Sequence, residues 1–248
     1  MTDVVNLEEN MGPGDAVVTY FNVISTHGKE LKELGTGSKS WNFIVISESM
    51  GLFEKDTQFI SGEIGILSRI NIVDELRLSG GETIQLRLAT PQKKEIELIA
   101  KVYDINIIDY ETANRAIVLK FCSPEKMTSD KIKFNRTYRK VPYSDMAADI
   151  FTTLNIVGDK KLDVETTKNV GTLIVNNKSP LAALNMITKT SISEKYLGAD
   201  YVFFESLDKM FKFRSIESMV DPNENEAAIT YYYDSPPKSA QSISHLVR

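Results

Sequence analysis

The segment from Glu95 to Asp109 constrains the fold of this chain more than any other. Apolar side chains occupy every second position of its first half: Ile96, Leu98, Ala100 and Val102. The second half keeps the period with the opposite parity: Tyr103, Ile105 and Ile107. A period of two residues is typical of a strand with one buried face. A change of parity within one strand indicates a bulge or a sharp bend, and both are common where a sheet curls into a barrel.

Further segments before residue 130 have the composition or the alternation of strands. They are Asp15–Ile24, Trp41–Glu48, Phe59–Leu67, Glu82–Ala89 and Asn114–Cys122. A short helix is expected at Asn71–Leu76, followed by the chain-breaking Ser79–Gly81. About six short strands predict a small antiparallel β-barrel over residues 15–130, a closed cylinder preceded by an N-terminal arm at residues 1–14.

After Arg136 the pattern changes to a mixture of helices and short strands. Ser144 suits the start of a helix with a single apolar stripe: Ala147, Ile150, Phe151 and Leu154. A second helix is expected to begin at Ser179–Pro180, with serine as the cap and proline at the first helical position. Short strands are expected at Gly171–Val175, Tyr201–Glu205, Met210–Arg214 and, near the end, Ala228–Asp234.

These patterns predict an α+β chain with four parts. The barrel at 15–130 follows the arm at 1–14, and a small α+β domain occupies 131–218. Residues 219–248 form a C-terminal strand and tail, interpreted as part of an incomplete second barrel.

The composition excludes several classes of protein. A content of 42% hydrophobic and 25% charged residues is ordinary for a soluble protein, and no stretch approaches the roughly 20 apolar residues of a membrane span. The acidic segment Met1–Gly14 is unlike a secretion signal.

The charges of the two halves of the chain differ. Residues 1–130 hold 13 Lys and Arg against 20 Asp and Glu, a net charge of −7, whereas residues 131–248 carry a net charge of +2. The acidic first half does not suit general binding to duplex nucleic acid.

No residue pattern indicates catalysis, a metal site or a cofactor. His27 and His245 lack a second ligand or a nucleophile at a defined spacing, so we interpret both as surface residues. Cys122 is the single cysteine, which excludes an intrachain disulfide framework, and we interpret it as an inert core thiol. Ser79–Gly81 precedes a strand rather than a helix, so it is not a phosphate-binding loop. We therefore expect a protein that is not an enzyme and has no catalytic, cofactor-binding or metal-binding residues.

An ordered set of segments resembles a known family. The set begins with Ile44–Ser49, Phe59–Ile66, Asn71–Ile84 and Thr90–Pro91, and it continues with Tyr138–Leu154, Asn176–Leu184, Tyr201–Glu205 and Phe211–Ser215. Ser61–Glu63 gives a Ser-Gly-Glu step in one strand, and Gly80–Glu82 a Gly-Gly-Glu turn. In this order the segments resemble the first barrel and the following α+β domain of the baseplate hub proteins of contractile-tailed bacteriophages. The hub half of type VI secretion spike proteins has the same order.

The resemblance implies a structural virion protein of the phage tail baseplate, assembled in the host cytoplasm. Hubs of this family are homotrimers that join the tail tube protein to the central spike protein, with two barrels per chain. Only 14 residues follow Asp234, too few for a full second barrel, so a second barrel is either supplied by another chain or completed by a neighbour. DNA would at most pass through the lumen without specific binding, for which an acidic lining is suitable.

Subunit contacts are expected along the Glu48–Phe59 connection and along Phe59–Leu67, which is interpreted as an edge strand, because pairing with a neighbour satisfies the free backbone groups of an edge. They are also expected on the last strand, because alternating aromatic residues usually fill a core or an interface. The candidate interface residues are Phe59, Ser61, Glu63, Ile64, Tyr231 and Tyr233. Two alternatives stay open: a distal tail or connector ring protein, and a cell-wall-binding or lytic tail module centred on Tyr138–Ser193.

Overall fold

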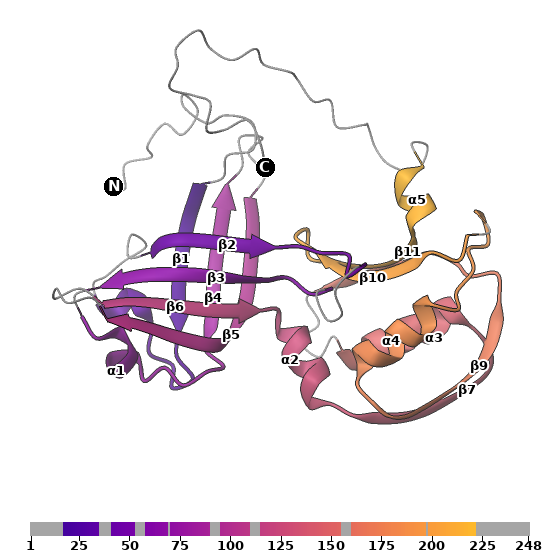
Figure 1. Ribbon diagram of the computed structural model, residues 1–248, viewed down its shortest axis with the longest axis horizontal. Helices are drawn as coiled ribbons and strands as arrows, with labels where there is room; N and C mark the ends of the chain where they lie inside the picture. Colours follow the sequence, from indigo (N-terminus) through magenta and orange to yellow (C-terminus); the bar gives the residue numbers. More distant parts are fainter. Residues whose placement is uncertain are drawn as a thin grey trace, which may run out of the picture.

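The computed structural model describes residues 17–34, 41–52, 58–68, 70–89, 95–109, 115–154, 160–196 and 198–221. These residues form two lobes that lie side by side, each around its own hydrophobic core (Figure 1). The N-terminal arm and the predicted strand Ala228–Asp234, with Tyr231 and Tyr233, lie outside the described residues. The domain boundaries drawn from the sequence stay predictions.

The first lobe is one curled antiparallel sheet of six strands. The strands are β1 (Val17–Ile24), β2 (Trp41–Ser47), β3 (Ser61–Ser68), β4 (Thr83–Ala89), β5 (Glu95–Asp109) and β6 (Arg115–Cys122). They lie in the order β1-β4-β5-β6-β3-β2. A one-turn 3₁₀ helix, η1 (Leu31–Leu34), follows β1, and the short helix α1 (Ile72–Leu76) follows β3. All six predicted strands and the helix expected at Asn71–Leu76 are therefore present.

β5 is the strand that bends the sheet. Its residues Glu95–Lys101 pair with β4, whereas Lys101–Asp109 pair with β6. The register with β6 shifts between Val102 and Asp104, so Tyr103 is the extra residue of a bulge. The predicted parity switch is thus confirmed. As Figure 1 shows, β1 and β4 consequently cross behind the layer of β2, β3 and β6.

The curl encloses the first core but does not close the sheet among the described strands. The core is built from the inward positions of both layers, including Phe21, Ile64, Leu86, Val102 and Leu119. β1 and β2 are the two outer strands, and in the described part of the chain neither has a second partner. The first lobe is therefore a half-barrel, and the closed cylinder expected from the sequence is not formed by these residues alone.

The second lobe follows through helix α2 (Pro124–Lys131). It contains a two-stranded antiparallel ribbon, β7 (Phe134–Pro142) with β9 (Val170–Lys178). It also contains a three-stranded sheet in the order β10 (Tyr201–Ser206), β11 (Met210–Ser215) and β8 (Lys161–Val164), in which β8 runs parallel to β11. The helices are α3 (Tyr143–Leu154), α4 (Pro180–Thr188) and the short α5 (Ile216–Val220).

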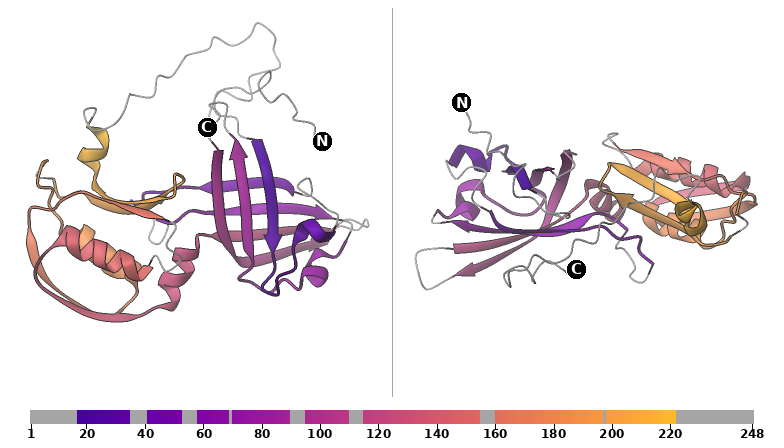
Figure 2. Two further views of the ribbon diagram at one scale, coloured as in Figure 1. Left: turned by 180° about the vertical axis from the view of Figure 1, so that it is seen from behind. Right: turned by 90° about the horizontal axis from the view of Figure 1, so that it is seen from above.

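Two helices and the three-stranded sheet form the second core, as Figure 2 shows from two further sides. The predicted stripe of α3 is buried: Ala147, Ile150, Phe151 and Leu154. Ser179 caps α4 as expected, because its hydroxyl accepts a hydrogen bond from the Ala182 amide. The ring of Phe211 stacks on Phe203 at 5.4 Å and meets Phe151 at 5.2 Å. The expected helices and short strands of this region are confirmed, whereas α2, β7, β8 and α5 were not predicted.

Candidate assembly surface

The outer face of the layer β2–β3–β6–β5 carries several exposed apolar side chains. Strand register decides which side chains lie on it. Ile44, Ile64 and Leu119 are aligned across the strands and face the core, so the next position on each strand faces outward. The outward row is Val45, Glu63, Lys120 and Asp104, in which the Lys120 ammonium lies 3.3 Å from Asp104.

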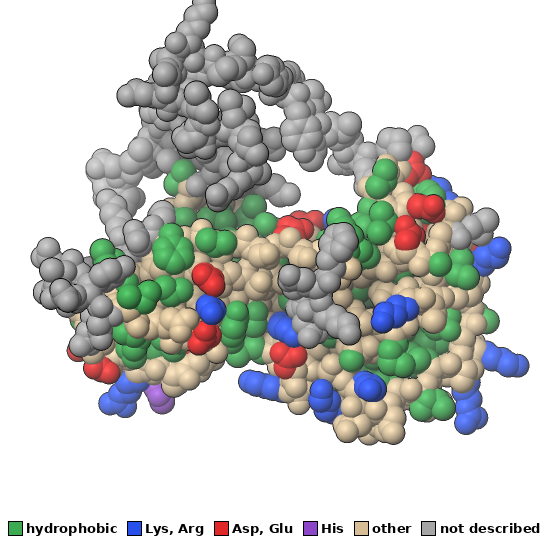
Figure 3. All heavy atoms as spheres, viewed as in Figure 1, with side chains coloured by type: hydrophobic (Ala, Val, Ile, Leu, Met, Phe, Trp, Pro, Cys, Tyr) green, Lys and Arg blue, Asp and Glu red, His purple; other side chains and the backbone are tan. Residues whose placement is uncertain are grey.

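Large apolar side chains lie at one end of this row and on the next rows of the same face. Phe43, Val45, Leu67 and Ile108 are each exposed. The Phe43 ring covers Gly65, where a Cβ atom would stand 2.2 Å from the ring, so the glycine lets the ring lie flat on the sheet. Figure 3, which views this layer, shows hydrophobic side chains gathered around acidic and basic groups. Large apolar side chains exposed together on one face are typical of a protein–protein contact surface.

The predicted interface residues on β3 divide into two groups. Ser61 and Glu63 are partly exposed on the outer face. Phe59 and Ile64 are 2% and 0% exposed, and each belongs to one of the chain's own cores. The interpretation of Phe59–Leu67 as an edge strand is wrong, because β3 pairs with β2 on one side and with β6 on the other. The edge of this layer is β2.

A groove of about 450 Å³ continues the outer face toward α2. Its lining brings together Phe59, Ser61 and Tyr103 with Met127 of α2. Cys122 also lines it, and burial raises the pKa of this thiol to about 11. The thiol therefore stays protonated at neutral pH, as the sequence interpretation of an inert cysteine requires. The groove extends the candidate surface to the point where the two lobes meet.

The joint between the lobes is held by a buried ion triad. The Lys160 ammonium lies 2.5 Å from carboxylate oxygens of both Glu125 and Glu205. The other oxygen of Glu205 accepts a hydrogen bond from the Ile60 amide at 3.1 Å, at the start of β3. The Glu205 amide donates to the Gln58 carbonyl at 2.7 Å. Burial raises the pKa of Glu205, and the charge of Lys160 opposes that rise. The triad thus ties β10 to α2 and to the beginning of β3.

Sequence reasoning missed this triad, although one signal for it was present. Every residue of β10 is buried, and Glu205 is the only one of them that carries a charge. A carboxylate within a buried strand needs a partner, but the sequence does not say that the partner is Lys160. A second bridge between the lobes is exposed: Lys209 lies 2.8 Å from Glu97 of β5.

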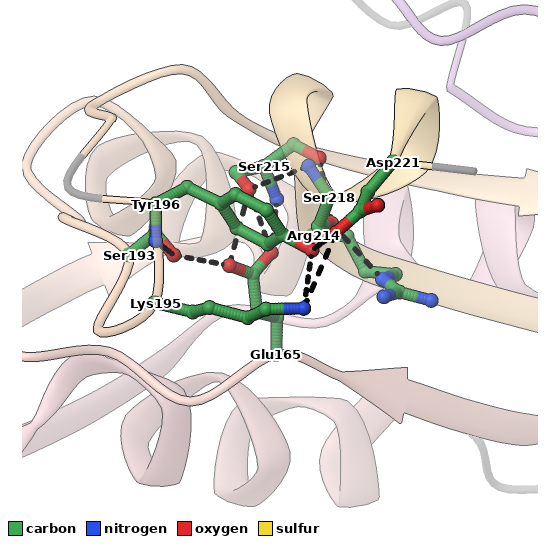
Figure 4. A network of polar contacts seen from close by, with 8 residues as sticks. All are labelled: Glu165, Ser193, Lys195, Tyr196, Arg214, Ser215, Ser218 and Asp221. Atoms are coloured by element: carbon green, nitrogen blue, oxygen red, sulfur yellow. Dashed lines mark hydrogen bonds and ion pairs between the residues drawn. The ribbon is translucent and has the colours of Figure 1, made fainter. Parts of the chain in front are cut away.

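A polar network fixes the end of the second lobe, where the described chain stops (Figure 4). The Glu165 carboxylate accepts hydrogen bonds from the Ser193 hydroxyl and from both the amide and the hydroxyl of Ser215. Burial alone would raise the pKa of Glu165, but these donors outweigh it and lower the pKa. The Tyr196 hydroxyl donates to Asp221 at 2.6 Å, just beyond α5. The point at which the C-terminal segment leaves the lobe is therefore defined.

Two further findings concern the described residues only. They contain no group of three or more His, Cys, Asp or Glu side chains arranged to hold a metal ion. None of their helices has the length and apolar character needed to cross a membrane.

The fold occurs in solved structures of tail proteins. The 43 kDa tail protein of prophage MuSo2 from Shewanella oneidensis aligns at a TM-score of 0.51 and 8% identity, over 80% of this chain and 53% of that protein. The tail protein from Neisseria meningitidis MC58 aligns at a TM-score of 0.50 and 12% identity, over 78% and 49%. A component of the E. coli type VI secretion system aligns at 0.42 and 8% identity, over 69% and 49%.

The first two alignments confirm at the level of the fold the resemblance drawn from the sequence. The chain spans about half the length of these solved structures. No protein-family model and no curated protein matches the sequence.

Proposed function

We propose that this chain is a structural protein of a contractile phage-type tail, acting as the hub of the baseplate. In this role three copies form a ring that joins the tail tube protein to the central spike protein within the virion. The observation that carries the proposal is the curled sheet with two outer strands, continuous with an α+β lobe, in the arrangement that tail proteins of solved structure share.

The open half-barrel supports a mechanism for assembly. Among the described residues β1 and β2 are the outer strands of the sheet, and the free backbone groups of an outer strand are satisfied when a strand of a neighbouring subunit pairs with it. Contacts that repeat around a closed ring leave no edge free. The apolar outer face beside β2, with Phe43 and Val45, would then be buried together with the edge. Shape and pairing, rather than a chemical reaction, constitute the proposed activity.

The charge of the first half supports a passive role toward DNA. Residues 1–130 carry a net charge of −7. Phosphates are repelled by a negatively charged wall and retained by Lys and Arg, so an acidic ring lets DNA pass without binding it.

The mass of the purified protein tests the proposal. Light scattering should give three chains per particle, and electron microscopy of assembled tails should show three copies at the baseplate. Six copies would instead indicate a ring of the tube or connector type. Retention on cell-wall sacculi would favour the cell-wall-binding alternative, because a structural adaptor should stay in solution.

Reversing one charge tests the surface itself. Glu63→Lys places a second cation beside Lys120 in the outward row and should lower the trimer fraction. Glu194→Lys is the matched control, because it makes the same change at an exposed position of the second lobe, outside the six-stranded sheet. An unchanged mass for Glu63→Lys would remove β3 from the proposed contact.

A further inference from the structure

A second groove lies between α4, β10 and the chain that leads from β2 to β3. Its volume is about 740 Å³. Three flexible apolar side chains on its wall are exposed: Met50, Leu52 and Met186. Val202 and Phe203 of β10 also line it. Methionine side chains adapt to the shape of a partner and make favourable contacts with aromatic rings, so this wall suits an apolar or aromatic segment.

Gln58 carries an acceptor atom beside the groove that has no donor among the described residues. Its side chain is 7% exposed and lines the groove. The Nε2 atom donates to Asn185 Oδ1 at 2.8 Å, but the buried Oε1 atom accepts no hydrogen bond from the described residues. Buried carbonyl oxygens in proteins are nearly always paired. The unpaired oxygen therefore calls for a backbone amide or a hydroxyl from a segment that occupies the groove.

The charges of the groove and of the C-terminal segment are complementary. The described lining includes Lys178 and Lys189 and no carboxylate. The segment 221–234 contains four carboxylates and no Lys or Arg: Asp221, Glu224, Glu226 and Asp234. Between the last two carboxylates lies a run of apolar, threonine and tyrosine residues, 227–233. The segment thus offers carboxylates for the two lysines, aromatic rings for the methionines, and amide and hydroxyl donors for Gln58.

The segment also starts close enough to reach the groove. Tyr201, on the groove wall, pairs in register with Ser215 of β11. Ser215 is also the N-cap of α5. α5 has five residues and is therefore about 8 Å long. Asp221 follows it, held by Tyr196. The 13 residues 222–234 span up to about 45 Å when extended, whereas the nine residues of α4, along the groove, extend over about 14 Å.

We propose that residues 222–234 fold back into this groove of their own subunit. In this arrangement Glu224 and Glu226 lie at Lys178 and Lys189, the tyrosines lie among the methionines, and a donor of the segment satisfies Gln58 Oε1. The inference stands apart from the proposed baseplate role, because it concerns one subunit and does not require a ring. It assigns Tyr231 and Tyr233 to a contact within the chain rather than between subunits.

Engineered disulfides in the full chain test the proposal. Met186→Cys is combined in turn with Ile229→Cys, Tyr231→Cys and Tyr233→Cys, because the register of the segment in the groove is open. Cys122 stays in place, since it is buried in the first lobe and does not line this groove. Under mild oxidation at least one pair should form a disulfide within a monomer, identified by mass spectrometry of the linked peptides. Lys161→Cys, at an exposed position on β8, with the same tail cysteines is the control and should not.

Charge reversal provides a second readout. Lys178→Glu with Lys189→Glu should lower the yield of the disulfide several-fold, and Glu224→Lys with Glu226→Lys in the same chain should restore it. Absence of a disulfide in all three pairs would overturn the proposal. A disulfide that joins two chains would overturn the assignment to the same subunit. A disulfide yield that stays unchanged in the charge-reversal variants would overturn the role of the lysines.

Discussion

The ammonium group of Lys160 lies 2.5 Å from a carboxylate oxygen of Glu205, and both side chains are buried at the joint between the two lobes. Lys160 precedes β8, whereas Glu205 lies within the buried strand β10, so the pair connects two separate parts of the second lobe. Because Glu205 also accepts from the Ile60 amide, the same carboxylate holds the start of β3. The orientation of the half-barrel on the second lobe therefore depends on Lys160, the cation that lies against both Glu205 and Glu125.

Removal of Lys160 is expected to be severely destabilising. Lys160→Met keeps most of the side-chain volume but leaves Glu125 and Glu205 buried without their cation. Breaking a buried ion pair from one side typically costs about 3–5 kcal/mol of unfolding free energy. Chemical denaturation of the variant measures this loss.

A matched variant separates burial from charge in that experiment. Lys209→Met breaks an ion pair to Glu97 of which both partners are exposed, so it should cost less than about 1 kcal/mol. Adding Glu125→Gln and Glu205→Gln to Lys160→Met should recover part of the loss, because no uncompensated charge remains. Equal losses for Lys160→Met and Lys209→Met would contradict a buried triad.

Glu165 should make the stability of the second lobe depend on pH. Burial acts to raise its pKa, but hydrogen bonds donated by Ser193 and Ser215 outweigh this, so the pKa in the folded chain lies below its ordinary value of 4.5. A carboxyl group with a lowered folded pKa stabilises the fold fully above its unfolded pKa, and this contribution disappears as the pH falls through the folded pKa. Glu165→Gln should therefore lower stability at neutral pH, and the difference from the original chain should shrink below about pH 4.5.

Thermal unfolding at a series of pH values measures that difference. Asp145→Asn is a suitable control, because Asp145 is exposed in the first turn of α3 and its removal should give a smaller change at neutral pH. A difference between Glu165→Gln and the original chain that persists unchanged into acid would contradict the role of the donors.

Local patterns in the sequence predicted most elements of the fold because their cause is local. The parity switch in Glu95–Asp109 is the direct result of the bulge at Tyr103, and the cap at Ser179 depends on residues within one turn. The position of β3 could not be predicted in this way. Whether a strand is an edge depends on which strands pair with it, and its two partners, β2 and β6, are separated in sequence by up to about 80 residues.

The candidate surface was predictable only in part for the same reason. Ser61 and Glu63 do lie on the outer face of the sheet, but the sequence could not show that Phe59 leaves the first lobe and enters the second core. The triad around Lys160 combines residues far apart in the chain, so its parts look like ordinary surface charges in the sequence. Only the register and the packing reveal which charged side chains are buried.

Phe59→Ala distinguishes a core residue from an interface residue. Phe59 is buried in the second core and its ring meets the edge of Phe211 at 5.8 Å. Truncation of a buried phenylalanine typically costs about 3–5 kcal/mol, whether or not subunits associate. The fall in melting temperature should therefore be the same across a hundredfold range of protein concentration. A fall that grows on dilution would instead place Phe59 at a contact between subunits.

Gly62 is expected to be indispensable for the pairing of β2 with β3. A Cβ atom at this position would stand 2.1 Å from the Val45 carbonyl oxygen and 2.4 Å from the Phe121 ring, and neither can retreat because one is backbone and the other is fully buried. Gly62→Ala should therefore cost about 1–3 kcal/mol of unfolding free energy through overpacking and should loosen the edge strand β2.

Gly28→Ala is the control: its φ of +85° is unfavourable for alanine, but no atom lies within 4 Å of the new Cβ. Hydrogen exchange should show faster exchange of the β2 and β3 amides in Gly62→Ala alone, because only this substitution forces the two strands apart. Equal exchange rates in both variants would contradict the prediction that pairing of β2 with β3 requires glycine at position 62.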